Sequence, residues 1–356
     1  MIDLSIFKDK KIFVTGHSGF KGSWLALLLE MLGAHVVGYS DFNSNFEHHA
    51  LVNQPGGSKK QDIRDQSVLK QELVGVNPDI IFHLAAQPLV SVGYQEPLNT
   101  WDINLNGTSN VLKCAELIPN LKGIVVITSD KVYLDDGSAK SHKESDSLGG
   151  HDPYSASKAG VELLISSYLN SYRNQVGIKK PMIVTARAGN VIGGGDFSRD
   201  RLFPDIFQAL NHEQQIQLRM PNAIRPWQHV LDCTYGYLNI AGRMLEKGEI
   251  NFGSYNFGPM ERESLTVSEV LSLVKKITAI KYENAIESHE NVFVERKALQ
   301  VDSARAKNDL GWEPQLSQEE AVNWTTEWYL KYKAEKTSCT KEQIESYSAL
   351  LMKNGE

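Results

Sequence analysis

The spacing of Tyr154 and Lys158 is the first feature of this sequence that could do chemistry. The two residues are four positions apart, so one helical turn places both on the same face. A free phenol has a pKa of about 10, and a cation about 4 Å away would lower that pKa by roughly three units. Lys158 could therefore make Tyr154 a usable base near neutral pH.

The context of this pair matters more than its spacing, because the same pattern recurs at Tyr332 and Lys336 in a polar tail. Tyr154 instead opens an amphipathic stretch soon after the apolar run "GIVVITS" at 123–129. Ligands of open α/β sheets bind at the carboxyl ends of the strands. We therefore expect the phenol of Tyr154 to lie near Ser129.

The stretch "VTGHSGFKGSW" at 14–24 has the spacing of a dinucleotide-phosphate loop. It lies between an apolar run and a helical stretch, so backbone amides and a helix N-terminus can bind a pyrophosphate there. A positive charge in the first helical turn opposes the helix dipole unless an anion is bound. We hypothesise that His17 and Lys21 contact the cofactor's phosphates; the alternative is that both are polar residues facing solvent. The glycines of the loop are Gly16, Gly19 and Gly22.

The cofactor predicted for this loop is NAD, although NADP is not excluded. An acidic residue that binds the adenine ribose should end the second strand, where Ser40 is followed by Asp41. Asp62 follows the expected third strand and either meets the adenine edge or caps a helix. Further residues assigned to the cofactor site are Phe20, Ile63, Leu84, Ala85 and Ala86.

Apolar runs alternate with helical stretches along the first half of the chain. The runs are at 11–16, 35–40, 79–85, 123–129 and 182–189. Continuous apolar runs suit strands buried on both faces, so we predict an α/β fold with a doubly wound parallel sheet, the Rossmann type. The predicted division is a dinucleotide-binding domain over 1–188, to which 230–258 returns, and a smaller substrate-binding lobe over 189–229 and 259–356. A helix over 265–277 is expected to be capped by Thr266 or Ser264.

Polar residues of the second lobe are candidates for binding a substrate. Asn190 follows a strand end, where its amide could bind phosphates or a sugar. Arg225 could make a bidentate phosphate contact, and Trp227 could stack on a base or fill the lobe. Arg199 and Arg201 could bind phosphate or belong to a surface loop.

Composition limits the possible partners and surroundings. The 356 residues carry a net charge of -6 without a cluster of Lys and Arg, which argues against a nucleic-acid partner. Three cysteines lack disulfide or zinc spacing, so no metal site is predicted and a reducing, cytoplasmic location is expected. No window approaches the roughly 18 apolar residues of a membrane span. The apolar stripes of 154–172 and 103–117 suit a homodimer interface, although core packing explains them almost as well.

The motifs together resemble a known family. "TGHSGFKG", "HLAAQ", "ITSDKVY", "DPYSASK" and "ARAGNVIGGGD", in this order, are similar to the extended short-chain dehydrogenases/reductases that act on nucleotide sugars. The combination of "GHSGFKGSW", "TSDK" and "IRPWQHVLD" resembles the 4,6-dehydratases of that family, and among them those acting on CDP-glucose. The resemblance extends from about residue 8 to about residue 332.

The resemblance implies roles for individual residues. Ser129, Tyr154 and Lys158 would carry oxidation at C4 of the sugar, and Thr128 could share the role of Ser129. Asp130 and Lys131 occupy the two positions where dehydrating members keep an acid and a base. The implied reaction oxidises C4, removes water across C5 and C6, and returns the hydride to C6. Its product would feed the synthesis of deoxysugars for a surface polysaccharide.

The order of steps follows from carbon acidity. A C5 hydrogen becomes acidic only once C4 is a ketone, so Asp130 must be protonated and Lys131 neutral when water leaves. Because successive strand residues point to opposite faces, both can reach one sugar only if the backbone leaves strand geometry near Ser129. An ordinary Asp/Lys pair ending a strand is the alternative. Rival functions are a dTDP- or GDP-hexose dehydratase, a nucleotide-sugar 4-epimerase, and a non-catalytic dinucleotide sensor.

Overall fold

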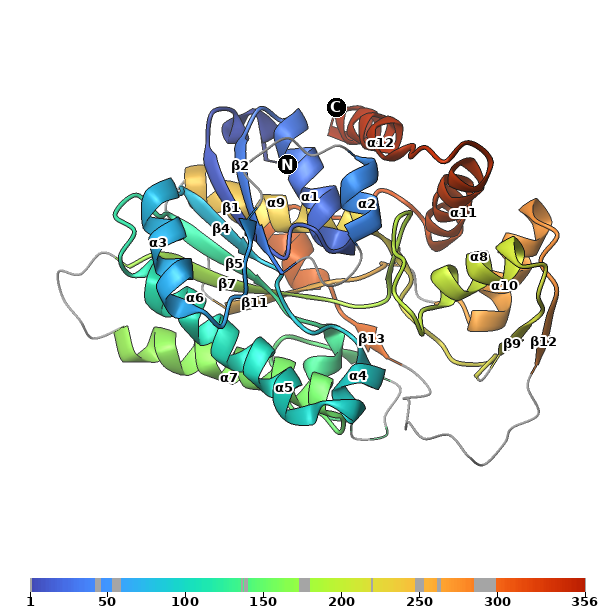
Figure 1. Ribbon diagram of the computed structural model, residues 1–356, viewed down its shortest axis with the longest axis horizontal. Helices are drawn as coiled ribbons and strands as arrows, with labels where there is room; N and C mark the ends of the chain where they lie inside the picture. Colours follow the sequence, from blue (N-terminus) through green and yellow to red (C-terminus); the bar gives the residue numbers. More distant parts are fainter. Residues whose placement is uncertain are drawn as a thin grey trace.

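A parallel sheet forms the centre of the molecule (Figure 1). The computed structural model describes residues 2–41, 46–52, 59–135, 137, 140–172, 180–218, 220–246, 253–260, 264–284 and 299–355. Seven strands pair in parallel in the order β11-β7-β5-β4-β1-β2-β3. This order is that of a Rossmann sheet and confirms the predicted fold class. The strands are β1 (Lys11–Thr15), β2 (His35–Ser40), β3 (Lys59–Lys60), β4 (Ile80–His83), β5 (Gly123–Ile127), β7 (Met182–Ala188) and β11 (Gly253–Phe257).

Two layers of helices cover the two faces of this sheet (Figure 1). Each layer buries its own apolar cluster, because the strands are apolar on both sides. The first layer consists of α1 (Phe20–Met31), α2 (Phe46–Leu51), α9 (Val230–Glu246) and α12 (Thr340–Gly355). The second consists of α3 (Gln66–Val76), α4 (Val90–Gln95), α5 (Pro97–Trp101), a π-helical turn over Asp102–Asn106, α6 (Gly107–Ala115) and α7 (Pro153–Tyr172).

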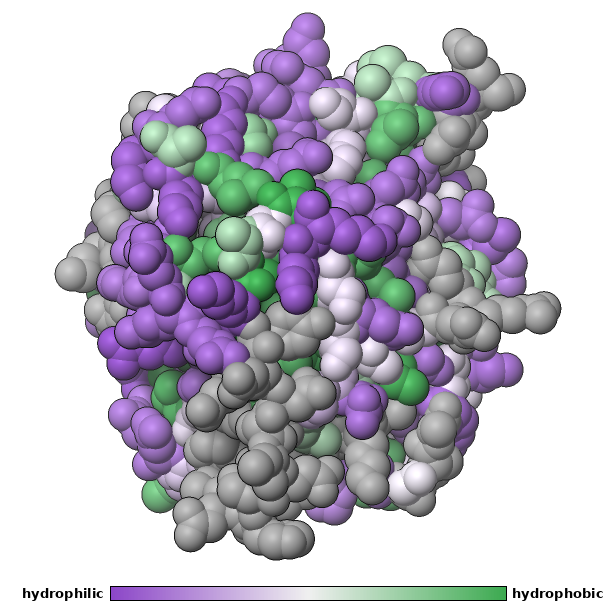
Figure 2. Space-filling model, turned by 90° about the vertical axis from the view of Figure 1, so that its right-hand side faces the viewer, coloured by the Kyte–Doolittle hydropathy of each residue, from purple (hydrophilic) through white to green (hydrophobic). Residues whose placement is uncertain are grey.

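A smaller lobe lies beyond the carboxyl edge of the sheet, at the right of Figure 1. The cap of α10 is Thr266, which forms a capping box with Glu269. The outer end of the lobe carries mostly hydrophilic side chains, with apolar ones in small groups (Figure 2). The elements of the lobe are α8 (Leu202–Asn211), α10 (Val267–Ile277), α11 (Gln318–Glu335) and three strand pairs, β8 (Val191–Ile192) with β10 (Gln228–His229), β9 (Ile216–Leu218) with β12 (Tyr282–Asn284), and β6 (Ser141–His142) with β13 (Gln300–Val301).

The C-terminal helix does not follow the predicted division, which assigned all of 259–356 to the lobe. Helix α12 packs against α1 instead, and its Tyr347 hydroxyl lies 2.8 Å from the Asp232 carboxylate in α9. Its buried Ile344 and Leu351 join the apolar cluster on the α1 side of the sheet. The chain therefore ends against the helical layer formed by α1 and α9. Within the described residues, no helix combines the length and apolar character needed to cross a membrane.

Candidate active site

The glycine loop between β1 and α1 has the shape of a phosphate cradle. Gly16 adopts a φ of +71°, and a Cβ atom there would lie 2.6 Å from the Ala85 nitrogen. A Cβ atom on Gly22 would lie 2.1 Å from the Gly16 carbonyl oxygen. Gly19 precedes α1 and offers no side-chain cap to its first turn. The residues present therefore fit a dinucleotide pyrophosphate over the amides at the start of α1.

His17 lies in this loop but carries no charge near neutral pH. Its ring packs against β2, where a Cβ on Gly38 would lie 2.1 Å from the ring, and its Nδ1 atom lies 3.1 Å from the Ser40 hydroxyl. Burial and the neighbouring His49 lower the pKa of His17 to about 4. Desolvation favours the neutral ring, so any contact of His17 with a phosphate would be a hydrogen bond from a neutral ring. The alternative of a solvent-facing His17 is wrong, because the residue is buried.

Lys21 points along α1 towards α9. Its ammonium nitrogen lies 3.5 Å from the Tyr237 hydroxyl. Burial lowers the pKa of Lys21, whereas the nearby Cys233 and Asp130 raise it. The ammonium charge of Lys21, which was expected to contact a phosphate, thus lies within electrostatic range of Asp130, a predicted catalytic residue.

The other predicted cofactor residues surround the same edge of the sheet. The Asp62 carboxylate accepts hydrogen bonds of 3.0 Å from Arg64, while Asp65 caps α3, so the capping alternative for Asp62 is wrong. Ile63 is buried against Gly107. Phe20 is buried in the core, and Leu84, Ala85 and Ala86 are half-buried just past β4.

The chain leaves strand geometry where β5 ends, as the sequence analysis predicted. The strand stops at Ile127, and a single 3-10 turn follows over Asp130–Val132. The Ser129 hydroxyl accepts a hydrogen bond from the Lys131 backbone nitrogen at 3.2 Å, which caps this turn. The alternation of strand side chains therefore no longer applies to Asp130 and Lys131.

The Asp130 carboxyl group is buried in this turn. The Ser129 hydroxyl donates to Oδ1 at 3.0 Å, and Oδ2 is buried without a hydrogen bond. Lys131 is half-buried, and no ion pair between it and Asp130 is found in the part of the chain that the structure describes. The alternative of a simple Asp/Lys ion pair therefore has no support in this geometry.

Tyr154 and Lys158 lie next to this turn on α7, and both are buried. The Lys158 ammonium donates to the Ile127 carbonyl oxygen at 3.1 Å. Burial and the charge of Lys21 lower its pKa to about 7. Burial raises the pKa of Tyr154 to about 12, although a hydrogen bond with Ser129 and the charge of Arg201 oppose the rise. The expected lowering of the phenol pKa is not found, because desolvation penalises the charged forms of both groups.

Thr128 is turned away from this cluster, which corrects its assignment as a substrate ligand. Its hydroxyl donates to the Glu162 carboxylate at 2.5 Å. The same carboxylate accepts hydrogen bonds from Arg187 at 2.7 Å and from Thr185 at 2.9 Å. Sequence reasoning missed Glu162 and Arg187. The available signal was a charged Arg187 inside the apolar run "MIVTARAG", since such residues are rarely buried without a partner.

The structure separates the predicted residues of the second lobe. Arg201 bonds to Asp196 at 2.8 Å and is close enough to influence Tyr154. Asn190 is half-buried with a φ of +46° directly after β7, Arg225 donates to the Ile224 carbonyl oxygen, and Arg199 is exposed.

Trp227 fills the lobe. It is buried, and its indole nitrogen donates to the Leu265 carbonyl oxygen at 2.9 Å. Of the two predicted roles, stacking on a base therefore has no support.

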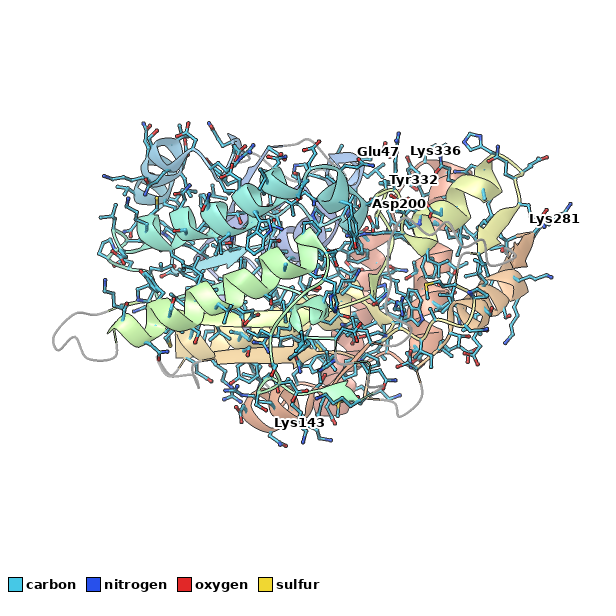
Figure 3. The ribbon with its side chains drawn as sticks, turned by 90° about the horizontal axis from the view of Figure 1, so that it is seen from below. Glu47, Lys143, Asp200, Lys281, Tyr332 and Lys336 are labelled. Carbon is cyan, nitrogen blue, oxygen red and sulfur yellow. The ribbon has the colours of Figure 1, made fainter. Side chains whose placement is uncertain are left out.

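The second Tyr/Lys pair has no comparable setting. Lys336 ends α11 in a left-handed conformation, and its ammonium lies 5.3 Å from the centre of the Tyr332 ring. Figure 3 labels both residues, far along the chain from the β5 turn.

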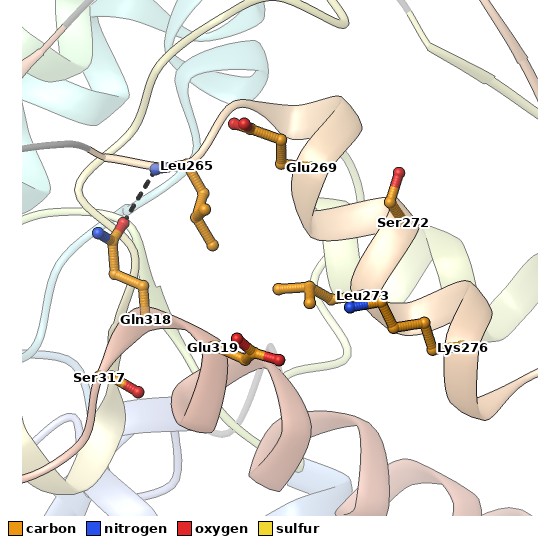
Figure 4. Close-up of a pocket in the computed structure, with 8 residues that line it drawn as sticks. All are labelled: Leu265, Glu269, Ser272, Leu273, Lys276, Ser317, Gln318 and Glu319. Carbon is orange, nitrogen blue, oxygen red and sulfur yellow. Dashed lines mark hydrogen bonds between the residues drawn. The ribbon is translucent and has the colours of Figure 1, made fainter.

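A pocket of about 500 Å³ lies between α10 and the start of α11. Gln318 accepts a hydrogen bond from the Leu265 nitrogen at 3.2 Å at one side of it (Figure 4). None of the residues predicted for catalysis or cofactor binding lines this pocket. Within the described residues, no group of three or more His, Cys, Asp or Glu side chains could hold a metal ion.

Comparisons with known proteins identify the family and the fold of this chain. The family model described as GDP-mannose 4,6 dehydratase matches residues 13–325. The CDP-glucose 4,6-dehydratase of Salmonella typhimurium is 37% identical over 98% of both chains. Two solved structures share the fold. The dTDP-glucose 4,6-dehydratase of Streptomyces venezuelae, with NAD and TYD bound, has a TM-score of 0.76 at 23% identity, covering 91% of this chain and 98% of its own. The UDP-glucose 4-epimerase of Thermotoga maritima with UDP-glucose has a TM-score of 0.77 at 22% identity, covering 91% and 99%.

Proposed function

Because this chain belongs to the GDP-mannose 4,6-dehydratase family, we propose that it dehydrates CDP-D-glucose to CDP-4-keto-6-deoxy-D-glucose. The observation that carries this proposal is the break after β5, which puts the Asp130 carboxyl beside Ser129 and within electrostatic range of Tyr154, with Lys131 next in the same turn. The choice of cytosine rests on the full-length similarity to a CDP-glucose 4,6-dehydratase.

The first step assigned to the chain is proton transfer from the C4 hydroxyl. Ser129 holds the C4 oxygen beside Tyr154, and Tyr154 receives the proton as C4 becomes a ketone. With a pKa of about 12 the phenol is protonated at neutral pH, and only its phenolate form can accept a proton. Tyr154 must therefore first release its own proton to solvent, which the positive charge of Arg201 favours. NAD, held by the loop of Gly16, Gly19 and Gly22, would accept the C4 hydride and later deliver it to C6.

The second step is the elimination of water. Lys131 removes the C5 proton, and the electrons of the C5–H bond form the C5=C6 double bond as the C6–O bond breaks. Asp130 donates its proton to the departing oxygen, so that water leaves. The two roles need two separate groups on one side of the sugar, and the placement of Asp130 and Lys131 in one 3-10 turn supports this assignment.

The nucleoside diphosphate is assigned to the facing lobe. Guanidinium groups form bidentate contacts with phosphate, and we assign this role to Arg201, whose charge acts on Tyr154, and to Arg225. Asn190 follows β7 at the same edge and is assigned to the sugar or its phosphates. We assign Arg199 the weaker role of an outer phosphate contact, because it is exposed.

Incubating the purified protein with NAD and CDP-, dTDP-, UDP- or GDP-hexoses tests the proposal. The expected result is a 4-keto-6-deoxy product from CDP-glucose, detected by its absorbance in alkali. A product from another nucleotide alone would reassign the base, and an epimerised sugar would redirect the assignment to a 4-epimerase. Binding of NAD without turnover of any sugar would favour a dinucleotide sensor.

We also propose that the protein is a homodimer that pairs through α5 and α7. The stripe of 154–172 that suggested this faces the core, but Leu98 and Leu163 on the outer side are 82% and 60% exposed. These two helices contact each other, and exposed apolar side chains on neighbouring helices suit an interface. Replacing Leu98 and Leu163 by Lys is expected to give monomers in light scattering; an unchanged mass would move the interface elsewhere.

A further inference from the structure

Gly189 is the residue between β7 and Asn190. At this position a side chain is excluded by the neighbouring atoms and not by the backbone conformation. Its φ lies outside the left-handed region, so an alanine backbone would be allowed there. A Cβ atom at this position, however, would lie 1.7 Å from Oδ2 and 1.9 Å from Cγ of Asp130. The carboxyl group of Asp130 thus occupies the volume that any other residue at 189 would fill.

The backbone at Gly189 cannot retreat to make room. Its carbonyl oxygen accepts a hydrogen bond from the Gln228 side chain at 3.1 Å, and the same amide donates to the Phe257 carbonyl oxygen at 2.6 Å. The Gln228 amide, which belongs to β10, therefore connects the end of β7 with the end of β11. By contrast, the Asp130 side chain is held at Oδ1 by a single hydrogen bond from Ser129. A side chain at 189 would consequently displace the carboxyl group before it displaced the scaffold.

We propose that Gly189 is a positioning residue for the elimination step, because it seats the Asp130 carboxyl against the end of β7. This inference rests on the proposed function, in which Asp130 protonates the departing C6 oxygen. A side chain at 189 moves the acid and breaks its hydrogen bond from Ser129, while Tyr154 and Lys158 keep their places on α7. Position 189 therefore determines whether the chain can eliminate water after it has oxidised C4.

The test compares two leaving groups in the Gly189→Ala variant. With CDP-glucose, turnover is expected to fall by about 100-fold or more, the lower end of what a positioned proton donor contributes. With the 6-deoxy-6-fluoro analogue of CDP-glucose, turnover is expected to fall far less, because fluoride leaves with less proton donation than hydroxide. Equal losses with both substrates, or no loss with either, would overturn the inference.

Two further variants separate positioning from general damage. Gly75→Ala adds the same methyl group in α3, where no atom lies within 4 Å, and is expected to match the wild type. In an Asp130→Ala background, Gly189→Ala is expected to cause no further loss, because residues that act as a unit are not additive. A further loss there would show that Gly189 acts through some other group.

A crystal structure of Gly189→Ala provides a readout that needs no turnover. The Asp130 carboxyl is expected to leave its place beside the end of β7, and an unmoved carboxyl would reject the inference. If the wild type converts neither sugar, the dehydratase proposal fails, while this structure still decides whether Gly189 seats Asp130.

Discussion

The unpartnered oxygen of Asp130 is the most informative atom in the site. A buried carboxyl oxygen without a hydrogen bond costs stability, so most such groups in native proteins are satisfied. Its sister oxygen is bound by Ser129, which fixes the direction in which the unpaired atom points. A group kept in this state at the carboxyl edge of a parallel sheet is best explained by a partner that arrives with the substrate.

Replacing Asp130 by Asn tests that explanation. The amide keeps the shape of the carboxyl group but cannot donate an acidic proton, so dehydration is expected to fall by about 10²- to 10⁴-fold. Product formation from CDP-glucose measures the loss, and the melting temperature checks that the fold is intact. Turnover at the wild-type rate would remove Asp130 from the chemistry.

The charge of Lys21 is expected to act on Lys158. Like charges disfavour each other, so Lys21 contributes to the low pKa of about 7 at Lys158. In Lys21→Met that pKa should rise, because the ammonium form of Lys158 loses a repelling neighbour. Nitrogen NMR of labelled lysine across a pH titration measures the shift. A pKa that falls or stays constant would contradict this account, since burial would then be the whole cause.

Residue types predicted the site better than they predicted side-chain directions. The motif around Ser129 and Tyr154 gave their proximity, because strand ends of a parallel sheet meet at one edge. The inward turn of Thr128 was not predictable, because its partner Glu162 is far away in the sequence and belongs to no motif. The burial of Trp227 depends likewise on a distant carbonyl group, that of Leu265.

At the scale of elements, the buried ion pair between Glu162 and Arg187 stabilises the segment that leads into the turn after β5. Glu162 on α7 and Arg187 on β7 are each 4% exposed and lie 2.7 Å apart. The Thr128 hydroxyl joins the same carboxylate, so the residue that precedes Ser129 is fixed from two elements. The position of the catalytic turn therefore depends on how α7 packs against the sheet.

Glu162→Gln is expected to destabilise the protein by about 3–5 kcal/mol, because it leaves the Arg187 charge buried without its partner. Thr185→Val, which removes only a neutral hydroxyl bonded to the same carboxylate, should cost about 1 kcal/mol. Denaturant unfolding of the two variants gives both values. Equal costs would mean that the ion pair carries no special weight at this position.

Periodicity located the elements but not all of their neighbours. The runs at 35–40 and 182–189 correspond to β2 and β7, and the ends agree within one residue. They could be predicted because a strand buried on both faces is a continuous run of apolar residues in the sequence. The placement of α12 was missed. Its sequence is polar and helical, and nothing local indicates that Tyr347 meets Asp232 across the molecule.

At the scale of the whole molecule, buried histidines join distant parts of the chain. His48 in α2 lies 2.6 Å from the Ser23 hydroxyl of α1 and 2.8 Å from the Thr340 hydroxyl of α12. His83 similarly lies between Thr15 and Thr108. These rings serve as neutral hydrogen-bonding groups, because burial lowers the pKa of both to about 3. The assembly of the layers therefore depends on rings that must stay uncharged.

Acid should unfold the protein through these rings, and His48→Asn tests one of them. Below the ordinary histidine pKa of about 6.5 these histidines bind protons in the unfolded chain but stay neutral in the folded protein. The free energy of unfolding therefore falls as the pH drops towards 3. His17, with a pKa of about 4, and His229, at about 3, act in the same direction. Burial raises the pKa of Asp232 to about 7, that of Glu30 to about 6 and that of Glu144, and these three carboxyl groups oppose the trend. Near pH 5, His48→Asn should reduce the slope of unfolding free energy against pH by about 1.4 kcal/mol per unit. Urea unfolding across a pH series measures the slope, and an unchanged slope would mean that His48 is protonated in the folded protein.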